Sequence, residues 1–337
     1  MSALVYSRRR FASSRLLGSS DSVAALTAVV LVLALGIANP QILSLANLFD
    51  LARNSLVNGV MALGVVLVLI SGGMDVSFTA IAAFAMYGTL KLALGTDTSM
   101  LAMLAIGSGI GGALGLVNGV LIAGLELPTF IVTLGTLSLF RGALLTLLGT
   151  TYIVDIPHPM VAFGNTLLFH VQAGNGVTYS LPLSFLILVG AAIGMGILLR
   201  GTVWGRKVYA LGGSELAAQR LGISVVRIKL AVYVLAGMLA GLAGVLHAAE
   251  VRTANPFDIV GTELNVIAAV VLGGARITGG HGTVWGTLLG VALVTVINTS
   301  LLLLGVPSYW NKIAVGMLIL LGTGLPILVE AWQARRR

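Results

Sequence analysis

Ten stretches of mostly apolar residues follow one another along the chain, each close to the length needed to cross a lipid bilayer. A crossing helix requires roughly 20 such residues, and its backbone polar groups must all be paired within the segment. Hydrophobic residues make up 58% of the 337 residues and charged residues only 9%, which is typical of an all-α integral membrane protein. The expected spans are residues 22–38, 51–71, 78–95, 100–125, 127–150, 181–199, 230–249, 259–275, 280–304 and 313–329.

The positions of the basic residues predict how these spans are oriented, because Lys and Arg collect in cytoplasmic loops. With the N-terminus inside, fourteen of the nineteen Lys and Arg residues lie on the cytoplasmic side, and four lie outside. We therefore expect a basic cytoplasmic segment at 1–21, a single transmembrane domain at 22–330 and a basic cytoplasmic tail at 331–337. The longest cytoplasmic loop is then residues 200–229.

Several classes of function are disfavoured by what the sequence lacks. The formal net charge of +8 arises from bases at the span ends, so we expect a lipid bilayer and no nucleic acid as partner. The absence of cysteine removes disulfides and thiolate sites, and the scattered histidines support no metal site. There is no GxxxxGK[ST] phosphate loop, so the chain cannot be its own ATPase. The Arg8-Arg9-Arg10 run resembles a twin-arginine export signal, but a flank of the first span is favoured.

The loop at 200–229 contains a short predicted helix. Two glycines and Ser214 precede a run of good helix formers that begins at Glu215, and Gly222 ends it. Small side chains at Ala217 and Ala218 would let a partner approach closely. We expect this element to dock an energy-coupling partner through Gly212, Gly213, Ser214, Glu215, Ala217, Ala218, Leu221, Gly222 and Ile223.

A second polar stretch separates two apolar spans at residues 71–77. Asp75 lies there between helices, where an acid is costly unless it is solvated, paired or capping a helix. It is interpreted either as a simple N-cap at the inner interface or as part of a broken helix that lines a transport path. The residues expected at such a path or break are Gly72, Gly73, Asp75, Ser77, Asn118, Thr133, Thr136, Arg141, Gly273 and Gly274.

Glycines recur at four-residue spacing in two of the expected spans. This spacing gives one smooth helix face, and close approach across small residues drives helix packing in lipid. Packing within the chain is favoured over a dimer face. The glycines concerned are Gly107, Gly111, Gly115 and Gly119 in the fourth span and Gly282, Gly286 and Gly290 in the ninth.

Several blocks resemble one known family in the same order. The segment Ser71-Gly72-Gly73-Met74-Asp75-Val76-Ser77 resembles the Ser-Gly-Gly-Ile-Asp-Leu-Ser signature of permease subunits in ribose-type ABC sugar importers. Further similar blocks begin at Leu127, Tyr209 and Val271, and the resemblance covers about residues 45–330. Phe78 and Thr79 depart from the small residues that the family usually has after this signature.

The resemblance implies a type II permease, similar to the vitamin B12 importer, with about ten helices in a bacterial inner membrane. It implies a second permease as homo- or heterodimer, an ABC ATPase that holds ATP and Mg, and an extracytoplasmic sugar-binding protein. The segment from Glu215 to Ile223 would be the coupling helix, and the chain itself would bind no cofactor and catalyse no reaction. The alternatives are a secondary transporter or facilitator and an intramembrane enzyme, but the expected spans contain almost no ionisable residues.

Overall fold

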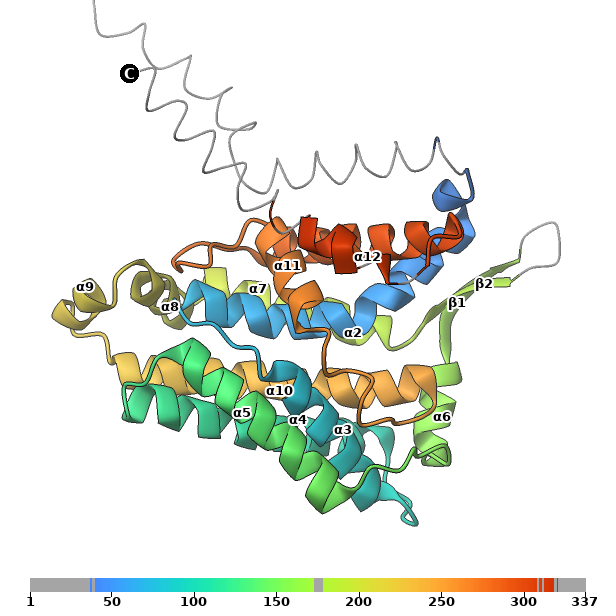
Figure 1. Ribbon diagram of the computed structural model, residues 1–337, viewed down its shortest axis with the longest axis horizontal. Helices are drawn as coiled ribbons and strands as arrows, with labels where there is room; N and C mark the ends of the chain where they lie inside the picture. Colours follow the sequence, from blue (N-terminus) through green and yellow to red (C-terminus); the bar gives the residue numbers. More distant parts are fainter. Residues whose placement is uncertain are drawn as a thin grey trace, which may run out of the picture.

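The computed structural model describes residues 37, 40–172, 178–307, 309–310, 312–317 and 320, and it is mostly helical (Figure 1). The expected span 22–38 lies almost entirely outside these residues, and so does most of the expected span 313–329. The elements are η1 (Pro40–Leu43), α2 (Leu45–Ile70), α3 (Phe78–Ala93), α4 (Met100–Gly119), η2 (Val120–Gly124), α5 (Thr129–Ala143), η3 (Leu144–Leu148), α6 (His158–Asn165), β1 (Leu167–Gln172), β2 (Thr178–Pro182), α7 (Phe185–Gly196), η4 (Ile197–Gly201), α8 (Val203–Gly213), α9 (Glu215–Arg220), α10 (Val225–Val251), α11 (Glu263–Leu272) and α12 (Val284–Leu303).

Five helices in the described part of the chain are long and apolar enough to cross a membrane: α2, α4 with η2, α5 with η3, α10 and α12. A sixth span results if α7 with η4 and α8, which are bent by 74° at their junction, are taken together. The multi-pass expectation is therefore confirmed in this coarser form. The expected span 259–275 contains only the ten-residue helix α11, because the chain before Glu263 forms turns and Gly274 takes a positive φ of 90°.

Helix α10 forms the centre of the bundle and packs against α2, α3 and α4 (Figure 1). The glycine row on α4 makes the closest of these contacts possible. A Cβ on Gly111 would overlap the carbonyl oxygen of Gly237, and one on Gly115 would overlap that of Tyr233. Gly107, Gly111, Gly115 and Gly119 all lie against α10, so this row of glycines packs within the chain.

The second glycine row was predicted incorrectly at its first member. Gly282 precedes α12, which begins at Val284 with the Thr283 hydroxyl accepting from the Gly286 amide at 2.9 Å. Gly282 instead lies against Ile70 of α2. Gly286 and Gly290 do lie on the helix, and their neighbours are the backbones of Gly273 and Ala269 at α11.

The two ends of the bundle differ in character. At one end, α6 is followed by an antiparallel pair of strands, β1 and β2. Ile153 is joined to Ala254 there by an isolated bridge. Helices α8 and α9 lie at the opposite end (Figure 1). We call these the hairpin end and the α9 end.

Candidate functional site

The chain is unwound between Ile70, where α2 ends, and Phe78, where α3 begins. Gly72 makes the turn with a φ of 84°. The Asp75 side chain is buried, with 4% of its surface exposed, and one carboxylate oxygen accepts from both the amide and the hydroxyl of Ser77 at 2.7 Å. Asp75 thus ties together the backbone immediately before α3, within the protein interior.

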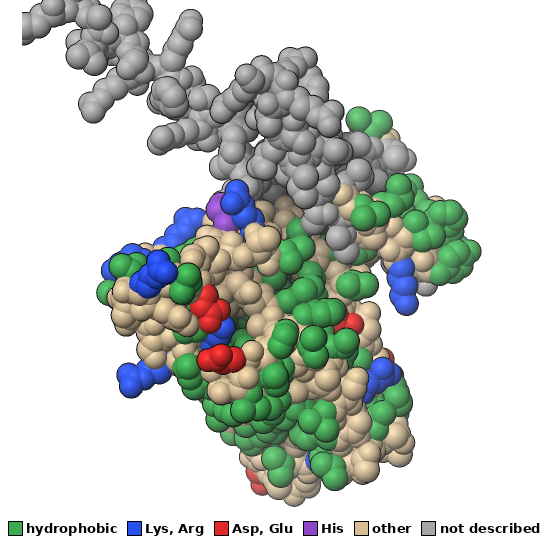
Figure 2. All heavy atoms as spheres, turned by 60° about the vertical axis from the view of Figure 1, so that its left-hand side comes forward, with side chains coloured by type: hydrophobic (Ala, Val, Ile, Leu, Met, Phe, Trp, Pro, Cys, Tyr) green, Lys and Arg blue, Asp and Glu red, His purple; other side chains and the backbone are tan. Residues whose placement is uncertain are grey.

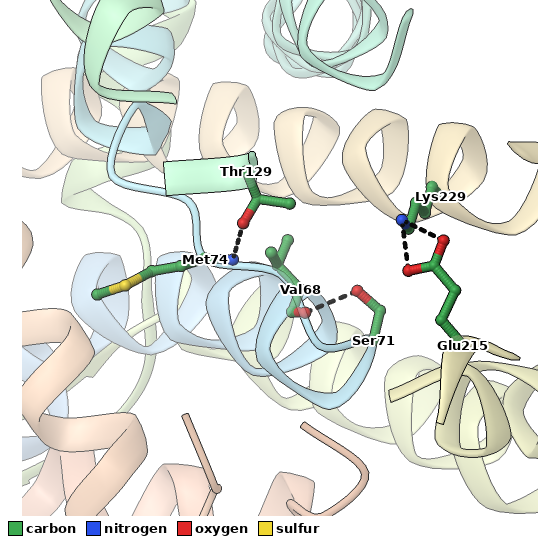
Figure 3. Close-up of polar contacts among 6 residues, drawn as sticks. All are labelled: Val68, Ser71, Met74, Thr129, Glu215 and Lys229. Carbon is green, nitrogen blue, oxygen red and sulfur yellow. Dashed lines mark hydrogen bonds and ion pairs between the residues drawn. The ribbon is translucent and has the colours of Figure 1, made fainter. Parts of the chain in front are cut away.

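Neighbouring helices hold this unwound segment in place. The Asn118 amide on α4 donates to the Ser77 hydroxyl at 2.7 Å. On α5, the Thr129 hydroxyl accepts from the Met74 amide at 3.2 Å (Figure 3). The Thr133 hydroxyl on the same helix donates to the Met74 carbonyl at 3.2 Å. Both backbone groups of Met74 are therefore paired although no helix contains them, as buried backbone requires.

A cluster of glycines connects the unwound segment to α8. We call Gly72, Gly212, Gly279 and Gly280 the glycine junction. A Cβ on Gly212 would overlap the Ile70 carbonyl oxygen and come within 2.6 Å of the Gly280 amide nitrogen. The Gly280 amide itself donates to the Ile70 carbonyl at 3.0 Å. Gly72 and Gly212, which the sequence assigned to separate sites, therefore meet backbone to backbone.

The predicted docking helix exists but is shorter than expected. Helix α9 has six residues, starts with the Ser214 hydroxyl accepting from the Ala217 amide at 3.3 Å, and is followed by Gly222 with a φ of 75°. Glu215 forms an ion pair with Lys229 of α10 at 2.8 Å (Figure 3). An ion pair this exposed contributes little stability, but it joins α9 to the long central helix.

The expectation that Ala218 offers room to a partner is wrong. Ala218 is only 1% exposed, because its methyl group faces the chain's own core. Ala217 is exposed, and the large apolar side chains exposed on this element are Leu216 and Leu221, at 59% and 77%. Figure 2, in which the α9 end is turned forward, shows Lys and Arg side chains beside apolar ones there.

Some of the other residues predicted for a transport path lie away from the unwound segment 71–77. Arg141 lies exposed on α5, whereas Thr133 and Thr136 on the same helix are buried. The prediction that Arg141 lies with these threonines at one site is therefore wrong for the single chain. Gly273 packs against α12, and Gly274, with a φ of 90°, turns the chain after α11.

A polar cluster at the hairpin end was not foreseen. Arg53 on α2 donates to Glu250 on α10 at 2.9 Å, and the Ser184 hydroxyl donates to the same carboxylate at 2.5 Å. Beside them lies a cavity of about 350 Å³, whose lining includes Asn58 and His247. Arg53 and Glu250 are 197 residues apart, so no local pattern could have paired them.

The comparisons with known proteins identify the family of the chain. A family model described as branched-chain amino acid transport system / permease component matches residues 47–322. The chain is 37% identical over 292 residues to a ribose import permease protein of Bacillus subtilis, covering 87% of this chain and 88% of the relative. It is 34% identical over 312 residues to an L-arabinose ABC transporter permease protein of Azospirillum brasilense, covering 92% and 87%. It is also 34% identical over 285 residues to an autoinducer 2 import system permease protein of an Enterobacter species, covering 84% and 79%. No solved structure matches.

The matched model covers most of the chain and the relatives align over nearly their full length, so the chain belongs to this family of permease components of ABC transport systems and is a transport subunit, not an enzyme.

Proposed function

We propose that the chain is the membrane permease of an ABC importer for a monosaccharide or a sugar-like solute. The observation that carries this proposal is the similarity, over more than four fifths of the chain, to permeases named for ribose, L-arabinose and autoinducer 2. The family description names branched-chain amino acids instead. The individual relatives are the better guide to solute class, because each is a single named permease that is 34% to 37% identical to this chain.

The partners of such a permease would take the steps that this chain cannot perform. An ABC ATPase, holding ATP and Mg, would dock at the α9 end, and an extracytoplasmic binding protein would deliver solute at the hairpin end. A second permease, either identical or different, would complete the path. The exposed face of α5 suits this second copy, because it carries the apolar side chains of Phe130 and Leu134 beside Arg141. A neighbouring permease there would remove the Arg141 guanidinium from lipid, where it would lack partners for its five donors.

The geometry of the α9 end supports energy coupling by contact. Its short helix is joined to α10 by the Glu215–Lys229 ion pair, and α8 reaches the unwound segment through the glycine junction. A displacement of α8 and α9 would therefore reach the segment 71–77 through direct backbone contact. Bundles packed this closely move as discrete units rather than deforming gradually.

We further propose the ten-span, type II arrangement in the bacterial inner membrane with both termini and residues 200–229 in the cytoplasm. Because the chain has no cysteine, single Cys residues report location directly. A Cys at Ser214, which is exposed at the start of α9, should react with a membrane-impermeant maleimide only after the membrane is opened. A Cys at the exposed Asn165 should react in intact cells whose outer membrane is permeable to the reagent. Labelling of the Ser214 position in intact cells would reverse the proposed orientation.

The solute class is tested by uptake in proteoliposomes that contain the permease, its cognate ATPase and its binding protein. We expect accumulation of a labelled pentose, ribose or arabinose, that requires both ATP and the binding protein. Labelled leucine tests the class that the family description names. Uptake of pentose without ATP or ATPase would favour a facilitator, and ATP-driven uptake of leucine alone would reject the sugar assignment.

A further inference from the structure

An apolar groove runs along α7 and η4 toward the α9 end of the molecule, between these two elements and the first turns of α12. Its volume is about 540 Å³. One wall is formed by α7 and η4 and the other by α12, with Tyr209 of α8 also lining it. Its lining includes Ile193, Gly196, Ile197, Arg200 and Trp285.

The groove is open to the outside of the described bundle. Ile193 and Ile197 are 58% and 62% exposed, and Trp285 is 71% exposed. Helix α7 packs against α2 and α12, away from the α5 face proposed for a second permease, so its large exposed apolar side chains are available to hydrocarbon. Exposed Trp is enriched where hydrocarbon meets the headgroups. The groove therefore opens toward lipid, with Trp285 near the level of the headgroups.

Its polar end carries a positive charge. Arg200 is the last residue but one of η4, it is exposed, and no carboxylate in the described part of the chain pairs with it. From Phe185 to Arg200 the lining follows about 22 Å of helix. This is longer than the hydrocarbon depth of one leaflet, roughly 15 Å. An acyl chain lying along α7 would thus bring its phosphate to the level of Arg200.

From this combination we propose that the groove binds one anionic phospholipid of the cytoplasmic leaflet, with an acyl chain along α7 and the phosphate on Arg200. The occupant is assigned by charge: a neutral sterol or a detergent tail would use the apolar walls but would leave the guanidinium without a counter-charge. The proposal rests on the orientation given under Proposed function, which places Arg200 on the cytoplasmic side. There the leaflet is negatively charged.

The site lies where it can affect coupling. The Tyr209 hydroxyl at the groove donates to the Gly282 carbonyl at 2.8 Å, and Gly282 lies against Ile70 at the end of α2. The same helix α8 ends in the glycine junction. A lipid bound between α7 and α12 would therefore stabilise the contacts that hold α8 against α12 and the end of α2.

Two glycines of α7 provide a matched test of the groove. A Cβ added at Gly196 or at Gly194 meets no atom within 4 Å, so neither substitution forces the first side-chain atom against the chain. Only Gly196 lines the groove. Gly196→Leu should therefore fill the site, and Gly194→Leu adds the same side chain to the same helix outside it.

Arg200 has a matched control in Arg206, which is exposed on α8 but does not line the groove. Arg200→Gln should weaken phosphatidylglycerol binding about fivefold, since one basic residue near an anionic surface contributes about that much. Arg206→Gln removes the same charge and should change binding much less.

The measurement is native mass spectrometry of the purified permease titrated with phosphatidylglycerol or phosphatidylcholine, together with thermal melting in each lipid. We expect one tightly held phosphatidylglycerol in the unmodified chain and in Gly194→Leu, and its loss in Gly196→Leu.

Equal binding by the two glycine variants, or equal effects of the two arginine variants, would overturn the proposal. A loss of thermal stability in Gly196→Leu that is the same in phosphatidylcholine alone would also overturn it, because a protein segment would then fill the groove. Pentose uptake is not the readout, so these outcomes stand apart from the proposed function.

Discussion

Gly212→Ala is expected to destabilise the permease and to abolish transport. The new methyl group would overlap the Ile70 carbonyl oxygen and approach the Gly280 amide nitrogen, both of which are backbone atoms. It would also separate these two atoms, which are hydrogen-bonded to each other at 3.0 Å. Forced overpacking and the loss of a buried hydrogen bond together cost about 2–4 kcal/mol. We expect a fall in thermal midpoint of about 5 °C or more.

The adjacent Gly213 is the matched control. A Cβ there meets no atom within 4 Å, and its φ is not positive, so Gly213→Ala should leave the folding yield and the thermal midpoint near those of the unmodified chain. The two variants differ only in which of two neighbouring glycines receives a methyl group. Thermal melting in detergent and uptake in proteoliposomes measure both effects. A fully stable and active Gly212→Ala would show that the glycine junction is looser than the structure describes.

The sequence predicts much of the fold, because apolar length and glycine spacing are local properties. The glycine row on α4 is an example, since its smooth face can be read from four positions of one helix. Its partner surface on α10, which includes Gly237, could not be read in the same way. Pairing between helices depends on the three-dimensional arrangement, not on periodicity.

For the functional residues too, local features can be read from the sequence, whereas contacts between distant segments cannot. The polar character of residues 71–77 is visible in the sequence, but the hydrogen bonds that join Thr129 and Thr133 to the Met74 backbone are not. The direction of a side chain on a short helix is equally hidden. Ala218 and Leu221 are three positions apart on one predicted docking element, yet one is buried in the chain and the other is largely exposed. A six-residue helix gives too few turns for hydrophobic periodicity to distinguish its faces.

The difference in exposure between Ala218 and Leu221 determines which substitutions test the docking of the ATPase. Ala218→Trp would overpack the permease's own core, so its loss of activity would say nothing about a partner. Asp at both Leu216 and Leu221 instead alters exposed side chains that contribute little to the fold. We expect this double variant to insert and melt normally, but to lose ATP-driven pentose uptake and the stimulation of ATP hydrolysis by the binding protein.

The reason is that exposed leucines on a docking element are buried when the partner binds, and a carboxylate in the same place must be desolvated without a counter-charge. Ser224→Asp provides the control, because Ser224 is also exposed and precedes α10, where Asp is a good helix cap. Co-purification of the ATPase, uptake and ATP hydrolysis are measured for each variant. Retained coupling in the double variant would place the ATPase contact elsewhere than on α9. Failure of the double variant to insert would show instead that these leucines face lipid, which would contradict the cytoplasmic position proposed for residues 200–229.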